Sequence, residues 1–327
     1  MCSLPLYLDT TQPFPRRRPN VCNAGLWYNK FCNLWPDKDW NRGLGTQKIE
    51  WIKTVSNGAI GERVLITEML KRQEALVKHH EGLCIQCNTS KSFVTGMGLD
   101  HPIENGFAWH YQLGVPYLPG SGVKGAIKSW AREWTGTKAE VIQEIFGDPG
   151  EGSIIFLDMI PRGPVYLKPE CMTPHYAPYH QKEDVPGDWH APVPIPFLAV
   201  AAGQGFQFGV LPTSRTSKEH MKMVEAWINE ALPEQGLGAK TSSDYGKLSV
   251  VSVSFEDWFD GQNFPRRTPV PYDWIAEELG KLSGSQRSRA IAHVRNSAIM
   301  EAIAKTMKKK KKTGKEFKLG DILNGAG

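Results

Sequence analysis

Residues 117–134, YLPGSGVKGAIKSWAREW, place a glycine-rich turn directly before a segment with a helical pattern. The apolar side chains of this segment recur at helical spacing and form one stripe of Val123, Ile127, Trp130, Ala131 and Trp134. Basic side chains follow every four residues on an adjoining face, as Lys124, Lys128 and Arg132. Ser121, with a glycine on either side, is the expected N-cap. The stretch therefore predicts a turn that opens an amphipathic helix with a basic flank.

The surrounding segments predict strands on both sides of this helix. A short strand is expected at Ser92–Thr95, a buried strand at 153–160 and a bent strand pair between 197 and 211. A second helix follows a capping box at 216–219, and a last strand is expected at 248–255. This order predicts an α+β domain with the ferredoxin-like (RRM-like, βαββαβ) layout. Its helices are expected to cover one face of the sheet and to leave the other face open for RNA.

Composition divides the chain into three regions. Residues 1–58 predict an irregular N-terminal extension that is held to the body by its tryptophans. The ferredoxin-like domain is predicted at 59–258, and it contains a long Pro-, His- and Tyr-rich insert at about 161–196. The alternating prolines of this insert exclude a central strand. Residues 259–327 predict a helical, basic C-terminal extension, in which 315–327 is expected to be poorly ordered.

The positive charge of the chain is concentrated at its C-terminal end. Residues 281–327 contain twelve Lys and Arg against three Asp and Glu, whereas residues 1–280 contain 27 against 31. Nucleic-acid binding by the body therefore requires local basic patches. The lysine run 308–312 is interpreted as a solvated tail or a non-specific RNA contact. No apolar run approaches the roughly 20 residues of a membrane span, so a cytoplasmic protein without membrane association is expected.

The first glycine loop, Pro119–Gly125, favours phosphate as a ligand. Backbone N–H groups at a glycine-rich turn before a helix face outward without partners, and the helix dipole favours an anion there. The predicted RNA-binding residues of this region are Gly120, Ser121, Gly122, Lys124, Gly125, Lys128 and Arg132. The alternative interpretation is a tight turn that only packs the helix on the sheet.

The second glycine loop is GLGAKTSSDYG at 236–246. It is not a nucleotide P-loop, because Ala239 precedes Lys240 and a strand follows instead of a helix. Its predicted RNA-binding residues suit backbone contact and base stacking, and they are Gly236, Gly238, Lys240, Thr241, Ser242 and Tyr245. The two loops are expected at opposite strand ends, where they contact different parts of an RNA, or one RNA and one neighbouring subunit.

Metal and cofactor sites receive little support from the sequence. Cys84 and Cys87 have the spacing of half a zinc site, but a second close pair is missing. The alternative interpretation is two reduced thiols just before a strand. No cofactor is predicted.

Catalysis is the less favoured alternative to binding. Metal-independent RNA cleavage needs an acid and a base, and the insert supplies candidates in His175, Tyr176, Tyr179, His180 and His190. Asp100 stands alone as a carboxylate for metal-dependent cleavage, and Asp158 is interpreted as structural. Trp189 is the tryptophan most expected to be exposed for a contact, whereas Trp130 and Trp134 are expected in the core.

Two segments of the chain resemble the hallmark loops of a known family. They are HPIENGFAWHYQLGVPYLPGSGVKGAIKSW at 101–130 and EQGLGAKTSSDYGKLSV at 234–250. Both are similar to loops of the RAMP superfamily from CRISPR effector complexes. With Ile145–Gly147 ahead of the second strand, the order of elements most resembles the sixth Cmr subunit of type III-B complexes. The chain departs from the family pattern at Asp244, where a glycine is usual.

This resemblance implies a function as well as a fold. It implies a non-catalytic RNA-binding subunit that caps the filament of a Cmr complex near the 3′ end of the guide RNA, in antiviral defence. The implied partners are guide RNA (crRNA), target RNA, the backbone RAMP subunits and the small helical subunit. A guide-processing RAMP endoribonuclease that uses His and Tyr residues of the insert, and a stand-alone RNA-binding module, are the alternatives.

Overall fold

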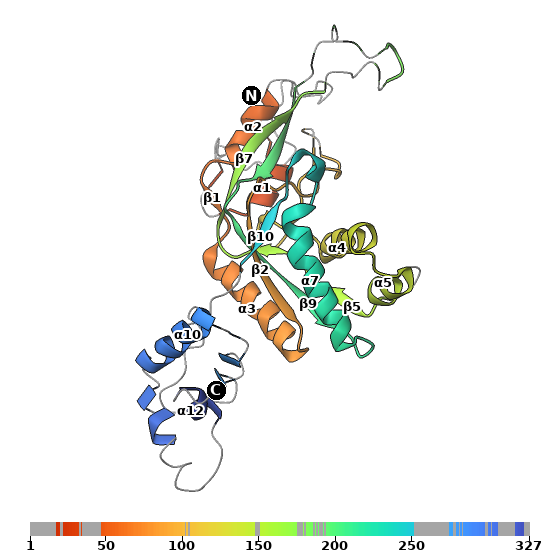
Figure 1. Cartoon of the computed structure of the whole chain (residues 1–327). Helices are drawn as coiled ribbons and strands as arrows, with labels where there is room; N and C mark the ends of the chain where they lie inside the picture. The colour runs from red at the N-terminus through yellow and green to blue at the C-terminus, as the bar shows by residue number, and fades with distance from the viewer. Residues whose placement is uncertain are drawn as a thin grey trace. The chain divides into compact units, whose positions relative to one another are not determined.

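A computed structural model describes the chain as two compact units, Met1–Val251 (unit 1) and Ser252–Gly327 (unit 2) (Figure 1). The described residues are 18–19, 22–32, 34, 47–101, 103, 105–147, 151–174, 179, 181–185, 187, 189, 192, 194–251, 275–276, 279–280, 282, 284–297, 300–301, 303–306 and 318–323. The domain boundary predicted at residue 258 lies outside these residues. No helix among them is long and apolar enough to cross a membrane.

A five-stranded antiparallel sheet forms the centre of the described part of unit 1. Its main path has the strand order β10-β2-β9-β5, and β6 also pairs with β9. The strands are β2 (Leu83–Thr89), β5 (Ile154–Phe156), β6 (Ile160–Pro161), β9 (Gly205–Pro212) and β10 (Leu248–Val250). With the helices described below, this sheet confirms the predicted α+β class.

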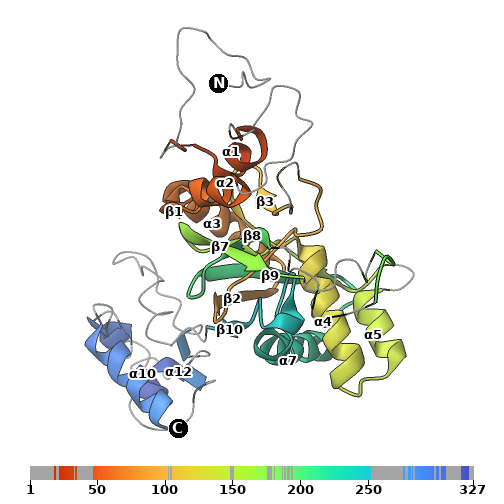
Figure 2. The ribbon, with the colours of Figure 1, turned by 90° about the horizontal axis from the view of Figure 1, so that it is seen from above.

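Helices cover both faces of this sheet. Helices α4 (Gly120–Trp134) and α7 (Lys218–Glu234) lie side by side on one face, and α3 (Arg63–His79) packs on the other (Figure 2). A Cβ atom at Gly209 of β9 would lie only 2.6 Å from a methyl group of Val77 in α3. The prediction that the second face stays open is therefore wrong around β2 and β9. The reason is that α3 has a buried apolar stripe that needs a surface to cover.

The first strand of the sheet begins earlier than predicted. It spans Leu83–Thr89, whereas the strand expected at Ser92–Thr95 has only one isolated bridge, from Phe93 to Val200. Ile85 and Cys87 point into the core while Cys84 and Asn88 are exposed, so the strand alternates polar and apolar residues. Of the strand predicted at 248–255, the part beyond Val251 lies outside the described residues.

A second sheet forms part of the insert. Its order is β1-β7-β8, from β1 (Ala59–Ile60), β7 (Val165–Met172) and β8 (Ile195–Val200). The prediction of an insert without regular structure is wrong for β7 and for the start of β8. Pro169 and Pro196 fit here because β8 is an edge strand and β1 pairs only with Val165 and Tyr166 of β7.

The N-terminal region is folded into the core and is not irregular where the structure describes it. Helix α1 (Ala24–Lys30) and helix α2 (Gln47–Val55) bury Trp27 and Trp51 in the main hydrophobic cluster. These two rings stack at a centroid distance of 5.8 Å, and the Trp51 indole N–H donates to the Tyr28 carbonyl at 3.2 Å. The tryptophans thus hold this region to the body, as predicted for Trp27, while Trp35 and Trp40 lie outside the described residues.

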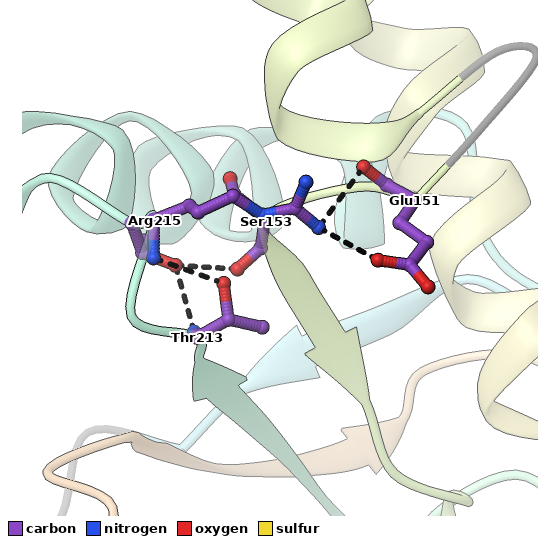
Figure 3. Close-up of polar contacts among 5 residues, drawn as sticks. Glu151, Ser153, Thr213 and Arg215 are labelled. Atoms are coloured by element: carbon purple, nitrogen blue, oxygen red, sulfur yellow. Dashed lines mark hydrogen bonds and ion pairs between the residues drawn. The ribbon is translucent and has the colours of Figure 1, made fainter.

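The turn between β9 and α7 is fastened to the start of β5. The Thr213 N–H donates to the Ser153 carbonyl at 3.0 Å, and the Thr216 hydroxyl donates to the same carbonyl (Figure 3). The Arg215 guanidinium points to Glu151, 3.1 Å from its carboxylate. The N-cap of α7 is Ser217, whose hydroxyl oxygen accepts the His220 N–H, and not Thr216 as the capping box predicts.

Unit 2 has a small helical core of its own. Helix α10 (Gly284–Asn296) and helix α12 (Lys318–Leu323) contribute to a cluster of buried apolar residues that includes Ala290, Val294, Leu319 and Leu323. The prediction of a poorly ordered segment at 315–327 is therefore wrong for 318–323, because two leucines spaced for one helix face are buried there. The lysine run 308–312 lies outside the described residues.

Candidate nucleic-acid interface

The first glycine loop is already capped by a side chain of the protein. Helix α4 begins at Gly120 with Pro119 as its N-cap, so Ser121 lies inside the first turn and is not the N-cap. The Gly120 N–H donates to the Asp158 carboxylate at 2.7 Å. This carboxylate satisfies a donor and complements the helix dipole, as a bound anion would. The predicted outward, unpartnered N–H is therefore wrong for Gly120, and the interpretation of Asp158 as structural is confirmed.

The glycines of this loop divide into two kinds. A Cβ atom at Gly120 would lie 2.1 Å from the Phe156 carbonyl, so this glycine lets α4 pack on β5. A Cβ atom at Gly125 would meet nothing within 4 Å, and one at Gly122 would touch only the Leu118 side chain. Ser121, Gly122 and Gly125 are exposed. The packing interpretation thus holds for Gly120, while the other small residues leave α4 with a smooth accessible surface.

The basic flank of α4 faces α5 (Ala139–Phe146). The Lys128 ammonium donates to the Gly147 carbonyl at the C-cap of α5, at 3.2 Å. Burial and the charge of Lys128 lower the pKa of the Lys124 ammonium. Arg132 is exposed one turn further along. The basic flank is therefore continuous.

The opposite side of α4 faces α7. The Trp130 indole N–H donates to the Glu230 carboxylate at 3.2 Å, and the Trp134 ring stacks on Trp130. Trp130 is half-buried, but 67% of Trp134 is exposed, so the prediction of a core position is wrong for Trp134. Trp134 lies in the last turn of the helix, where the stripe passes beyond what the neighbouring helices cover.

The second glycine loop is fastened by its backbone to the segment that follows β2. The Gly246 N–H donates to the Ser92 carbonyl at 2.7 Å, and the Ala239 N–H donates to the Val94 carbonyl at 2.8 Å. Gly238 has a φ of +86°, and a Cβ atom there would lie 2.2 Å from the Val94 carbonyl. Gly236 is buried at a φ of +77°. Both glycines serve close packing, because a side chain at either position would strain the backbone.

The side chains of this loop gather on Phe197 of β8. The Lys240 ammonium lies 5.7 Å from the centre of the Phe197 ring, a cation–π distance. The Tyr245 ring meets the same ring edge to face at 5.9 Å. Burial, and then the charge of Glu170, raise the pKa of the Tyr245 hydroxyl. Thr241, half-buried, and Ser242, exposed, lie in the short 3-10 helix η1 (Thr241–Ser243).

The unusual carboxylate of this loop has a partner. Asp244 forms an ion pair with Lys91 at 3.0 Å, and both side chains are largely exposed. A pair of this kind contributes little to stability, but it offsets the negative charge beside Lys240.

The two loops lie at the same end of the sheet. The Gln235 side-chain amide, one residue before the second loop, donates to the Ala126 carbonyl of α4 at 3.2 Å. The Thr95 hydroxyl donates to the Tyr117 carbonyl before the first loop at 2.8 Å. The expectation of opposite strand ends is therefore wrong. Because β10 is antiparallel to β2, with Leu248 opposite Thr89, the start of β10 meets the end of β2.

The cysteine pair does not form half of a zinc site. Cys84 and Cys87 lie within β2 and not before it, and three residues of strand put their thiols on opposite faces. Cys84 is exposed, whereas Cys87 is in the core, where burial raises the pKa of its thiol to about 12. Among the described residues, no group of three or more metal-ligating side chains occurs.

The candidate catalytic residues are not brought together where they are described. His175, Tyr176, His180 and His190 lie outside the described residues, and Tyr179 is exposed. Asp100 is exposed on a loop. Trp189 is 70% exposed, as predicted.

Tyr111 is an exposed aromatic residue that the sequence pattern did not predict as a candidate contact. Tyr111, 88% exposed, lies between β3 (Trp109–His110) and β4 (Val115–Pro116), a hairpin beside the first loop. The ring of His110 meets that of Tyr117 edge to face at 5.7 Å. The signal available in the sequence was the close run of aromatic residues around a glycine at 109–117.

Comparison with known proteins identifies a family for this chain. Residues 84–249, about half of the chain, match the family model described as the RAMP superfamily, and the chain belongs to that superfamily. It is similar to "CRISPR system Cmr subunit Cmr6" of Pyrococcus furiosus, with 26% identity over 226 residues, 49% of this chain and 65% of that protein. It is also similar to "CRISPR system CMR subunit Cmr6" of Saccharolobus solfataricus, with 28% identity over 158 residues, 46% of this chain and 51% of that protein. The chain thus spans between half and two thirds of these relatives.

A solved structure shares the fold. A chain in "Cryo-EM structure of the Type III-B Cmr-beta bound to cognate target RNA" has a TM-score of 0.52 and 19% identity, covering 71% of this chain and 92% of that chain. At this identity the likeness extends to the fold alone.

Proposed function

We propose that this protein is a non-catalytic RNA-binding subunit of a type III-B CRISPR (Cmr) effector complex. In this proposal it contacts guide RNA and target RNA near the 3′ end of the guide and caps the filament of backbone RAMP subunits, beside the small helical subunit. Membership of the RAMP superfamily and the similarity to two Cmr6 proteins support the assignment.

The strand order supports a ferredoxin-like layout for the domain. A βαββαβ chain has its first strand between its fourth and third, which is the order β10-β2-β9-β5. Helix α4 follows β2 and helix α7 follows β9, as that layout requires. The pair β7 and β8 then forms a large insert before β9.

The observation that carries the proposal is the meeting of the two glycine loops at one sheet end. Together they make a surface, here called the loop surface, of Ser121, Gly122, Gly125, Lys240 and Ser242. The first three present little side chain, so a nucleic-acid backbone can approach α4 closely. Lys240 supplies a charge for phosphate, and Ser242 supplies a hydroxyl for phosphate or ribose. The other predicted residues of the second loop support this surface. Gly236 and Gly238 allow the backbone conformation of the loop, and Thr241 and Tyr245 are half-buried.

The test is RNA binding across a salt series with Lys240→Ala. Loss of one phosphate contact should weaken binding about equally for different RNA sequences and lower the salt slope by about 0.7 to 1. Lys53→Ala removes the same charge from an exposed position on α2 and is the control. If Lys240→Ala binds RNA with the affinity and slope of the control, the loops are packing turns.

The non-catalytic part of the proposal has a separate test. Purified protein is expected to leave repeat-derived RNA intact with or without divalent metal. Cleavage that disappears in His175→Ala or His180→Ala would contradict it.

A further inference from the structure

A second basic site lies between α4 and α5, on the side of α4 that faces away from α7. A cavity of about 280 Å³ opens there, lined by Lys128, Arg132, Thr137, Ala139, Ile142 and Gln143. None of these lining residues carries a carboxylate. The lining of this groove therefore joins two positive charges to the apolar side chains of Ala139 and Ile142.

The walls of this groove are held in place by hydrogen bonds. The Thr135 hydroxyl donates to the Ala131 carbonyl at 2.8 Å, which leaves the Thr137 hydroxyl to donate to Thr135 at 2.7 Å. Lys128 is fixed by its bond to the Gly147 carbonyl, at the end of α5. The groove is thus shaped before any ligand arrives, which lowers the entropic cost of binding.

Arg132 is the residue positioned to bind a ligand. Its side chain is exposed, and within the described part of the chain its guanidinium forms no hydrogen bond or ion pair. Burial first, and then the charge of Lys128, lower the pKa of Lys124, so the positive charges of this flank repel one another. An anion placed among them would relieve that repulsion.

We infer that this groove binds a phosphodiester group of RNA, an inference that rests on the proposed function. The planar guanidinium of Arg132 can donate two parallel hydrogen bonds to phosphate oxygens, and Lys128 adds a second charge. Gly122 and Arg132 are ten residues apart, which corresponds to about 15 Å along the helix. One extended RNA strand can therefore cross the loop surface and continue along α4 into the groove.

The groove lies further along α4 than the loop surface, and Lys128 there contacts the end of α5. Lys240 of the loop surface lies over the Phe197 ring, and it shares no hydrogen-bond or ion-pair partner with Arg132 among the described residues. Two such sites are expected to act additively. In the double variant Lys240→Ala/Arg132→Ala, the fold-loss of RNA affinity should consequently equal the product of the two single fold-losses.

The experiment measures binding of an oligouridylate RNA to the full chain by fluorescence anisotropy over a salt series. Arg132→Ala should weaken binding about tenfold at low salt and lower the salt slope by about 0.7. Arg132→Lys keeps the positive charge but cannot donate the two parallel hydrogen bonds of a guanidinium. It should therefore keep the wild-type salt slope and lose part of the RNA affinity. The matched control is Lys138→Ala, an exposed cation at the N-cap of α5 that does not line the groove. It should change binding much less.

The outcomes separate the groove from the function. If the wild-type chain binds RNA and Arg132→Ala matches Lys138→Ala in affinity and slope, the groove inference is wrong and the proposed function stands. If the wild-type chain binds no RNA, both are wrong. If Arg132→Ala binds RNA normally but no longer associates with other Cmr subunits, the groove is a protein contact and the phosphodiester inference is overturned.

Discussion

Replacing Asp158 tests the capped helix end directly. In Asp158→Ala, the buried Gly120 N–H loses its acceptor at 2.7 Å. Loss of an N-cap acceptor costs about 1 kcal/mol, and loss of a negative charge at the helix N-terminus costs about 0.3–1 kcal/mol. The unfolding free energy of unit 1 should therefore fall by about 1–2 kcal/mol. Asp158→Asn keeps a carbonyl oxygen that can accept the N–H, so it should lose only the charge contribution of about 0.3–1 kcal/mol.

Urea unfolding followed by tryptophan fluorescence measures this difference. Five tryptophans of the described part of unit 1 are buried or half-buried: Trp27, Trp51, Trp109, Trp130 and Trp227. The urea concentration at the midpoint of unfolding should decrease. The slope of the unfolding free energy against urea concentration should stay the same, because the surface exposed on unfolding is unchanged. Asp100→Ala removes an exposed carboxylate and should stay within about 0.5 kcal/mol of wild type. If Asp158→Ala has wild-type stability, Asp158 does not act as the cap and the helix end is open to another anion.

Three further predictions follow from burial and backbone geometry. Gly238→Ala should destabilise unit 1 by more than about 1 kcal/mol, because φ is +86° there and the new Cβ would lie against the Val94 carbonyl. Gly125→Ala is exposed inside α4 and should stabilise unit 1 by up to about 1 kcal/mol in the same urea assay. Burial lowers the pKa of His101 from 6.5 to about 4. Because the unfolded chain binds this proton more readily, the unfolding free energy should fall by up to about 3 kcal/mol as the pH is lowered from 6.5 towards 4. In His101→Gln, the urea midpoint should not show this pH-dependent decrease. Leu319→Ala should lower the stability of unit 2 by about 2–5 kcal/mol in thermal melting, whereas Glu301→Ala, an exposed change in the same unit, should have little effect.

Local pattern in the sequence predicted helices α4 and α7, but it did not predict α1, α2 or α5. The stripe of Val123, Ile127 and Ala131 is buried in α4, as its spacing predicts. The first strand was misplaced although its residues alternate between polar Cys84, Gln86 and Asn88 and buried Ile85 and Cys87, which is the pattern of a half-buried strand. Strand β7 was missed because it lies in the Pro-, His- and Tyr-rich stretch, where the apolar residues show no clear period.

The candidate site was harder to predict than the fold. Its loops were found from glycine and lysine, but the roles of the glycines depend on carbonyl groups far away in the sequence, such as that of Phe156 beside Gly120. The cap at Gly120 comes from Asp158, which no local pattern connects to it. The direction faced by Lys128 depends on where α5 packs. Each of these is a tertiary contact, which sequence spacing does not encode.

The segment Ser92–Thr95 is hydrogen-bonded to the second glycine loop and to Tyr117, just before the first loop. These contacts determine when the loops can form during synthesis of the chain. Its backbone partners include Ala108, Val200, Ala239 and Gly246, most of them more than a hundred positions further along the chain. Contacts between such distant residues form late in folding, since the loop-closure entropy must be overcome first. The second glycine loop can therefore not reach its final conformation until synthesis has passed Gly246. A nascent chain shorter than this would not yet present the loop surface to RNA.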